Sequence, residues 1–160
     1  MAFSSLMVQL KDVLVDEIGD ERLVVTDKGF LDSKSGMTID FILDSIPEID
    51  EFLVFDSIRV SGLKDIAANK ASALCCRDEV KDYIDMAFLT LDQKLKLADL
   101  AGLAEEKFKI GTVTEEKLIE ELVSKREMFR IVPDMFLFDG KAQVSRVNRQ
   151  IDFLLQTVKL

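Results

Sequence analysis

Apolar residues recur at helical spacing in the first part of the chain. Between Met1 and Ile18 they stand at positions 6, 10, 13, 14 and 18, and the charged residues of this segment lie off that stripe. Spacings of three and four residues place side chains on one face of a helix. We therefore expect an amphipathic helix that ends at Gly19.

The hydrophobic pattern changes between Arg22 and Val60. Short runs rich in β-branched and aromatic residues replace the helical stripe, and turn-forming residues separate them. Glycines at positions 29 and 36 supply turns, and Pro47 lies in a longer connection. This pattern predicts four or five strands, largely antiparallel, within the segments RLVVT, GFLDS, MTIDFIL, FLVF and SIRV.

Helical spacing returns at Ser61 and continues to the end of the chain. Ser61 is a candidate N-cap for a helix over 63–76, and Asp78 is a candidate N-cap for a helix over 79–89. Sequences that fit the capping box begin at Thr90 and Thr112. Further helices are expected near 91–101, 113–128 and 143–158.

These patterns together predict an α+β fold. A small, mainly antiparallel sheet is followed by a helical bundle. We expect a helix-plus-sheet region over 1–61 and a helical region over 62–160, packed as one compact unit. A chain of 160 residues is the usual size of one domain.

The composition is that of a globular protein and excludes disordered and membrane-spanning chains. Charged residues make up 32% and hydrophobic residues 48% of the chain, and no apolar run is long enough to cross a bilayer. The N-terminus has no signal-peptide pattern, so we expect a cytoplasmic protein without a membrane partner. The net charge of -9 argues against broad nonspecific binding of nucleic acid, although a local basic patch is still compatible with it.

The chain contains no histidine and two adjacent cysteines, Cys75 and Cys76. Adjacent cysteines neither form an ordinary disulfide with each other nor supply the spaced pairs of zinc sites, and we interpret them as packed in a helix. Without histidine, any chemistry falls to Asp, Glu, Lys, Arg or Tyr83.

Four charged residues concentrate between Ile58 and Leu89. Lys70 and Arg77 are seven residues apart, two helical turns, and Asp82 and Asp85 are three apart on the next predicted helix. One interpretation is a structural ion-pair cluster. The other is an anion site, in which Lys70 acts as a point charge on a phosphate while Arg77 either grips an oxygen pair or holds Asp82 in place.

The order Asp65-Ile66-Ala67-Ala68, Lys70, Arg77, Lys81-Asp82, Asp85 resembles a known motif. It is similar to the DIAAxK, arginine and KDxxD helix pair of the AbiEii-like nucleotidyltransferases, which are toxins of abortive-infection, toxin–antitoxin and phage-defence systems. The resemblance covers roughly 38–108. It implies a partial nucleotidyltransferase fold.

The resemblance also implies roles for individual residues. Lys70 and Asp82 correspond to active-site positions, Arg77 and Lys81 to nucleotide or phosphate-binding positions, and Asp85 to a supporting charge. Asp40 falls on the strand where nucleotidyltransferase folds often place a third acidic residue, so it is a candidate metal ligand. An exposed aspartate on an edge strand also serves solubility.

Part of the family's site is missing from the segment before the strands. The family opens its nucleotide site with a glycine-serine or glycine-glycine turn and a strand carrying an acid-x-acid pair for metal ions, and the residues up to Gly19 show neither. We therefore expect a truncated or split nucleotidyltransferase that is inactive alone. If any activity remains, it would use Mg and a nucleoside triphosphate.

Two alternative functions are also compatible with the sequence. One is a non-catalytic module that binds protein or RNA, and the other is an active enzyme with a non-standard metal site built from Asp40, Asp82 and Lys70. The candidate partners are a cognate antitoxin, the missing N-terminal half, tRNA, or a second copy of the chain paired through an open sheet edge. The helix before Gly19 could instead cover that edge.

Overall fold

The computed structural model describes residues 3–26, 28–41, 46–56 and 58–157. The chain divides into two compact units, Met1–Ser45 and Ile46–Leu160, and each is described by itself. Every strand pair is antiparallel, and helices make up most of the second unit. The predicted α+β class is confirmed, with the strands divided between a three-stranded and a two-stranded sheet.

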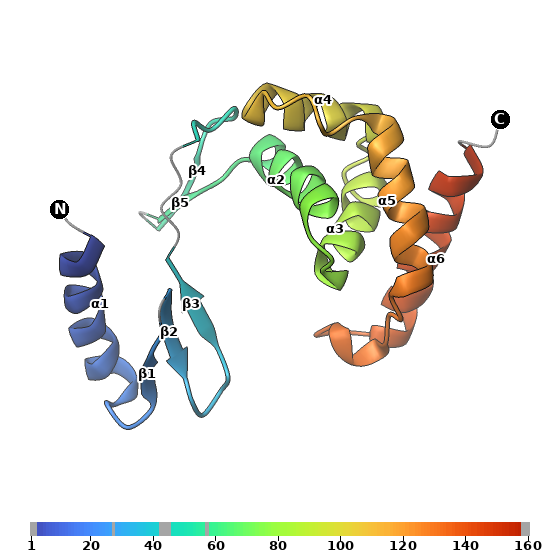
Figure 1. The fold of residues 1–160 in the computed structure, drawn as a ribbon. Helices are drawn as coiled ribbons and strands as arrows, with labels where there is room; N and C mark the ends of the chain where they lie inside the picture. The colour runs from blue at the N-terminus through green and yellow to red at the C-terminus, as the bar shows by residue number, and fades with distance from the viewer. Residues whose placement is uncertain (1–2, 27, 42–45, 57, 158–160) are drawn as a thin grey trace. The chain divides into compact units, whose positions relative to one another are not determined.

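The first unit is a helix followed by a three-stranded meander (Figure 1). Helix α1 spans Phe3–Ile18 and contacts the first two strands. Gly19 ends the helix, as predicted, because its φ of 89° is a left-handed conformation that glycine adopts without strain. The strands β1 (Leu23–Val25), β2 (Gly29–Asp32) and β3 (Thr38–Asp40) pair in the order β1-β2-β3.

Strand β2 is the centre of this small sheet. Its Phe30 is almost fully buried and meets the ring of Phe41 edge-on at 5.9 Å between centroids. A Cβ added at Gly29 would lie 1.8 Å from the carbonyl oxygen of Ile39, so only glycine allows β2 and β3 to approach here. At the far end of β2, Asp32 accepts two hydrogen bonds from the Arg22 guanidinium.

In the described part of the second unit, a β-hairpin precedes five α-helices. Strands β4 (Leu53–Phe55) and β5 (Ile58–Val60) pair only with each other among the described residues, and they lead directly into the first helix of the unit. The helices are α2 (Leu63–Cys76), α3 (Val80–Leu91), α4 (Leu97–Phe108), α5 (Glu115–Met128) and α6 (Gly140–Thr157), with a 3-10 turn η1 (Pro133–Met135) before α6.

The division between the units lies at residue 45, whereas the sequence pattern changes at residue 61. The hairpin therefore groups with the helices. A physical reason lies just before β4, where the backbone N–H groups of Ile49 and Asp50 donate to the carboxylate of Asp65 on α2. These contacts join the base of the hairpin to the helical unit although its strands have the periodicity of a sheet.

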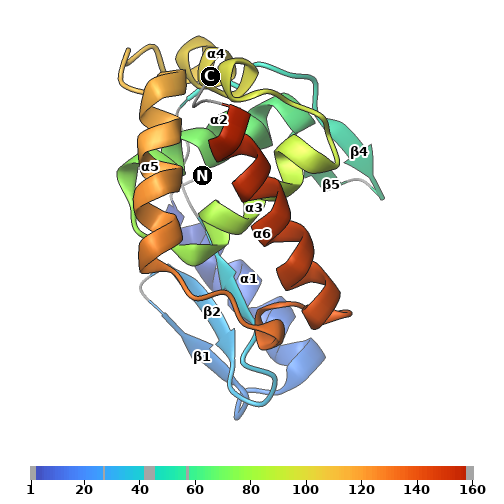
Figure 2. The same ribbon diagram turned by 90° about the vertical axis from the view of Figure 1, so that its right-hand side faces the viewer.

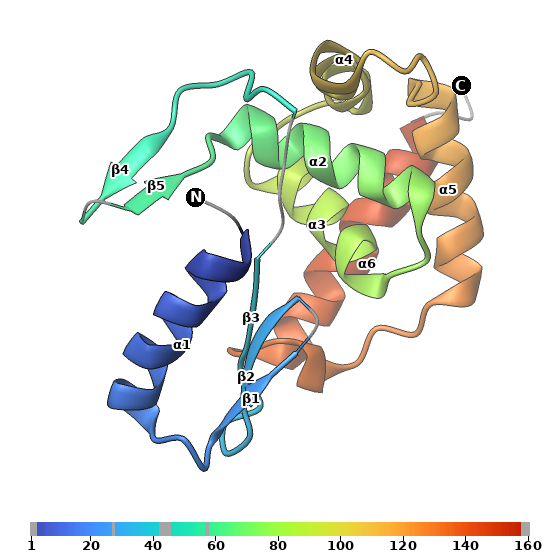
Figure 3. The ribbon, with the colours of Figure 1, turned by 60° about the vertical axis from the view of Figure 1, so that its left-hand side comes forward.

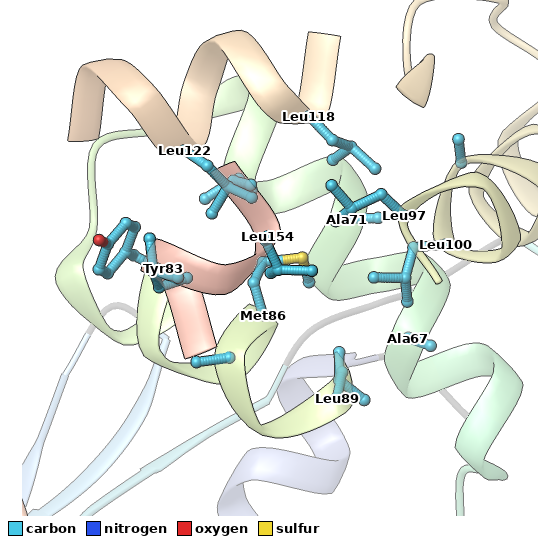
Figure 4. Close-up of a cluster of buried hydrophobic side chains, with 14 of the residues drawn as sticks. Ala67, Ala71, Tyr83, Met86, Leu89, Leu97, Leu100, Leu118, Leu122 and Leu154 are labelled. Carbon is cyan, nitrogen blue, oxygen red and sulfur yellow. The ribbon is translucent and has the colours of Figure 1, made fainter. Parts of the chain in front are cut away.

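The helical unit has one apolar core, to which all five helices contribute. Small residues on α2, Ala67 and Ala71, are fully buried and let α4 pack closely against it. Figure 4 shows Met86 and Leu154 among the side chains at the centre of this cluster. Figure 2 shows α6 close to α3, and both of these helices also contact α5.

Helix α2 has its predicted bounds of 63–76, whereas the predicted cap residues and other helix starts differ from the structure by a few residues. The residue before α2 is Gly62 rather than Ser61, and the residue before α3 is Glu79 rather than Asp78. Thr90 does not begin a helix, because its hydroxyl donates to the carbonyls of Met86 and Ala87 inside α3. Helix α3 therefore continues to Leu91, and the next helix, expected near 91–101, spans 97–108.

The last two helices lie close to their predicted positions. Helix α5 begins after Thr114, whose hydroxyl accepts from the N–H of Lys117. This cap is two residues later than the predicted Thr112. Helix α6 begins at Gly140 rather than 143. None of the described helices is long and apolar enough to cross a membrane.

Strands in both sheets are exposed to solvent. All three residues of β3 are exposed, and so are all residues of β4 and β5. Helix α1 packs against β1 and β2. Pairing of a second copy through a sheet edge stays a prediction.

Candidate functional site

The charged residues singled out in the sequence meet between α2 and α3. We call Lys70, Arg77, Asp82 and Asp85 the Asp82 cluster. Lys70 lies on α2, and Arg77 is the residue that ends this helix in an extended conformation. The short link after Arg77 turns the chain back, so that Asp82 in the first turn of α3 faces both cations.

Arg77 grips the Asp82 carboxylate with two hydrogen bonds. Its Nε lies 2.7 Å from Oδ2 and its Nη2 3.1 Å from Oδ1. Lys70 Nζ lies 3.3 Å from Asp82 Oδ1 and 2.5 Å from Asp85 Oδ2. The predicted convergence of Lys70, Arg77 and Asp82 on one surface is confirmed.

Burial differs sharply within the Asp82 cluster. The Asp82 side chain is fully buried, whereas the side chains of Lys70 and Arg77 are 29% and 46% exposed. Burial alone would raise the pKa of Asp82, but the hydrogen bonds and positive charges of Arg77 and Lys70 outweigh it and hold this pKa below its ordinary value. The cluster therefore contains a buried anion with two cations that reach solvent.

The pKa of Lys70 shifts in the complementary direction. Burial alone would lower it, but the hydrogen bond and charge of Asp85, together with the charge of Asp82, raise the pKa above its ordinary value. Lys70 is therefore a fixed positive charge at every physiological pH, suited to holding an anion and unsuited to accepting a proton.

Lys70 and Asp85 also line a cavity of about 190 Å³ on the surface of the helical unit. The remaining lining residues come from α2, α3 and the residues just after α3: Leu63, Ile66, Phe88, Leu89, Asp92 and Gln93. The Phe88 ring has two further contacts, with the guanidinium of Arg146 at 5.6 Å from its centroid and with the roughly perpendicular ring of Phe136. The lining of the cavity is therefore partly apolar and partly charged.

Two further candidate residues lie outside these contacts. Lys81 pairs with Glu79 at 2.7 Å and is largely exposed. Among the described contacts it is linked to the Asp82 cluster through Glu79, which also lies 3.5 Å from Arg77. Asp40 belongs to the first unit, where it is an exposed residue of β3. The described residues contain no group of three or more acidic or cysteine side chains placed to hold a metal ion.

A second charged cluster was not predicted. Asp65, the first residue of the family-like motif, is fully buried and lies 2.9 Å from the equally buried Nζ of Lys107 on α4. Lys107 also contacts Glu48, at 3.2 Å. We call these three residues the Asp65 cluster.

Both oxygens of the Asp65 carboxylate accept hydrogen bonds. It accepts from Lys107 and from the backbone N–H groups of Ile49 and Asp50 at 3.0 and 2.9 Å. Burial alone would raise the pKa of Asp65, but the hydrogen bonds around it outweigh burial and lower the pKa. The sequence signals this cluster only through Asp65, which begins the Asp-Ile-Ala-Ala motif. Its partners Lys107 and Glu48 lie too far away along the chain for a local pattern to reveal them.

The remaining nucleophile candidates are poorly placed for chemistry. Burial raises the pKa of Tyr83 to about 12, and its ring packs edge-on against Phe129. Burial likewise raises the pKa of the Cys75 thiol to about 11. Both cysteines are free, in agreement with the prediction that they do not pair.

Comparison with known proteins adds no assignment: no family model, no curated protein and no solved structure matches this chain.

Proposed function

We propose that this chain is a cytoplasmic protein of the nucleotidyltransferase type, related to abortive-infection toxins, in which Lys70 binds a phosphate of a nucleotide. The observation that supports it most is the position of the Lys70 ammonium. The group is held by the buried Asp82 on one side and opens onto a cavity on the other. A fixed cation at the mouth of a cavity suits an anionic ligand.

In this proposal Asp82 is a positioning residue. Its carboxylate is fully buried, and both oxygens are used by Arg77 and Lys70. It would therefore act on a ligand through the two cations. Arg77, nearly half exposed, retains donors that can face solvent, and it is the second candidate contact for a phosphate.

Asp85 would be the element that a ligand displaces. It is the closest partner of Lys70 and its side chain is 37% exposed, so it can turn to solvent at little cost. Phosphate would then replace one carboxylate beside Lys70, while Asp82 stays in place. We expect weak binding, because Asp85 and Asp92 make the cavity mouth partly acidic.

We further propose that the 160 residues bind a nucleotide without transferring it. None of the described strands carries the two acids, separated by one residue, that hold metal ions in this chemistry. A polypeptide carrying such a pair would complete the site. Mg and a nucleoside triphosphate would then be the cofactor and the substrate.

Calorimetric titration of the four nucleoside triphosphates into the protein tests this proposal. Lys70→Ala should weaken binding roughly 10-fold or more, the value of one charge-assisted hydrogen bond. The matched control is Lys117→Ala, which removes a lysine that also pairs with two carboxylates, Glu120 and Glu121, but lies on α5. Equal losses in both variants, or no binding by the unaltered protein, would reject the phosphate site.

A labelled-nucleotide assay with RNA and protein acceptors tests the catalytic half of the proposal. We expect no incorporation by the chain alone, with Mg or Mn present. Incorporation that disappears in Lys70→Ala would instead support the active enzyme with a non-standard metal site.

A second function, a non-catalytic binding module, has support from a different part of the molecule. The β4–β5 hairpin exposes apolar side chains that the helical core does not cover.

A further inference from the structure

The β4–β5 hairpin exposes large apolar side chains on paired strands. Leu53, Phe55, Ile58 and Val60 are between 43% and 73% exposed. Figure 3 shows the hairpin extending away from the helices of its own unit. Isolated apolar residues are normal on protein surfaces, but adjacent ones on a strand pair form a patch.

The strand register places these four residues on one face. Leu53 pairs with Val60 and Phe55 with Ile58, while Val54 pairs with Arg59 between them. Because side chains alternate along a strand, the two outer pairs share a face and the middle pair points to the other. The first face, which we call the apolar face, carries no charged residue within the strands.

The only basic residue of the two strands is engaged on the opposite face. The Arg59 guanidinium lies over the ring of Phe52, 5.7 Å from its centroid. The two acidic residues that flank β4, Glu51 and Asp56, are exposed. Asp56 has a φ of 45°, typical of a tight hairpin turn. The apolar face is therefore bordered by negative charge at both ends of β4.

The hairpin is held firmly at its base. The buried Asp65 and Lys107 fix the backbone of Ile49 and Asp50 just before β4. Ser61, just after β5, donates to the Glu48 carboxylate at 3.3 Å. A two-stranded hairpin is marginally stable by itself, so these buried contacts hold in place a surface that its strands alone would not.

We propose that the apolar face of the β4–β5 hairpin is a docking surface for a basic amphipathic segment of a partner protein. Its apolar side chains would cover Leu53, Phe55, Ile58 and Val60. Its Lys or Arg residues would meet Glu51 and Asp56 at the border. Such an interface buries an apolar centre inside a charged rim, as protein interfaces do.

Charge distinguishes this partner from a second copy of the chain. A second copy would bring the same acidic border and the same net charge of -9, with Arg59 turned away on the other face. Like charges would then face each other around the contact, and like-charge pairing disfavours association. A basic segment replaces that repulsion by attraction.

A synthetic helical peptide with leucines on one face and lysines on the other is the probe, and its glutamate counterpart is the control. Fluorescence anisotropy with the full chain should show binding of the lysine peptide alone. The double variant Phe55→Ser, Ile58→Ser should weaken it at least 10-fold. The matched control is Phe138→Ser, which removes a phenylalanine that is 81% exposed but lies outside any strand.

The role of the acidic residues that border the apolar face is tested by the double variant Glu51→Gln, Asp56→Asn. Asparagine tolerates the positive φ of Asp56, so the turn is preserved. We expect several-fold weaker binding and a smaller dependence on salt. Lys70→Ala should leave peptide affinity unchanged, so that failure of the nucleotide site and failure of the docking surface are distinguishable.

Three results would overturn the proposal. The first is equal binding of the glutamate peptide, and the second is a loss of affinity in Phe138→Ser as large as that in the hairpin variant. The third is a concentration-dependent dimer in sedimentation that the hairpin variant abolishes, which would make a second copy the occupant. Unchanged urea midpoints in the hairpin, border and Phe138→Ser variants ensure that these comparisons concern folded protein.

Discussion

The Asp82 and Asp65 clusters contain similar groups in different surroundings. Each has a fully buried aspartate that is held by a lysine from a neighbouring element. In the Asp65 cluster the lysine is buried as well, and two backbone N–H groups also donate to the carboxylate. In the Asp82 cluster the two cations reach solvent, and no backbone N–H donates to the carboxylate among the described contacts.

The difference separates a structural ion pair from a group that a ligand can reach. A buried pair has exchanged all its water for protein contacts, so neither member is free to bind anything else. A cation that is one third exposed keeps donors for a ligand while its buried partner fixes its position. We therefore propose a binding role for the Asp82 cluster and a structural role for the Asp65 cluster.

The largest effect is expected from Lys107→Met. The variant leaves the Asp65 carboxylate buried without its cation, which costs about 3–5 kcal/mol in the free energy of unfolding. Urea denaturation, monitored by circular dichroism, measures this loss of stability. The control is Lys141→Met on the exposed start of α6, for which we expect a change within about 0.5 kcal/mol. Similar values for both variants would remove the distinction between the clusters.

A smaller loss, about 1–3 kcal/mol, is expected from Asp82→Ala. The variant removes charge-assisted hydrogen bonds, but Arg77 and Lys70 can regain water because both are partly exposed. The same denaturation experiment applies, with Asp85→Ala as the companion variant of a partly exposed partner. If Asp82→Ala were as costly as Lys107→Met, the Asp82 cluster would have to be regarded as structural too.

Acid should weaken both clusters, with a defined sign. The folded pKa of Asp82 and of Asp65 lies below the ordinary value of 3.8, so each carboxylate contributes stability that is present above that value. The contribution is lost as the pH falls below 3.8 toward the folded pKa. Thermal melts at decreasing pH should show a smaller acid-induced loss in Asp82→Asn than in the unaltered protein. Equal acid-induced losses in the two proteins would contradict a lowered pKa of Asp82 in the folded state.

The smallest effect on stability is expected from Lys70→Ala, at most about 1 kcal/mol. Lys70 is partly exposed, and Arg77 alone can still satisfy both oxygens of Asp82. The same variant should nevertheless lose nucleotide binding. A pronounced drop in the urea midpoint of Lys70→Ala would show that its contribution is structural.

The Asp82 cluster was predictable because its geometry is local. Lys70 lies on α2, Arg77 directly follows the same helix, and Asp82 comes after one short link. The Asp65 cluster was not predictable, since it joins Asp65 to Lys107, 42 residues later. A sequence pattern contains the periodicity of each helix but not the pairing between distant helices.

Prediction of the fold from the sequence has the same limit. Apolar periodicity identified the helices and the strand segments, and Gly19 ended its helix as expected. The exact helix starts depend on competing hydrogen bonds, and Thr90 fits a capping pattern while donating instead to its own helix. The grouping of β4 and β5 with the helices depends on Asp65, which no local pattern could indicate.

The long sequence separation within the Asp65 cluster has a consequence for folding kinetics. Lys107 joins Asp65 across 42 residues and Glu48 across 59, so these contacts can form only after α2 and α4 have packed. Contacts that close such loops late contribute little to the transition state. We therefore expect that Lys107→Met accelerates unfolding and leaves the folding rate nearly unchanged. On this basis the buried pair determines how long the base of the hairpin stays attached, rather than how fast the helices assemble.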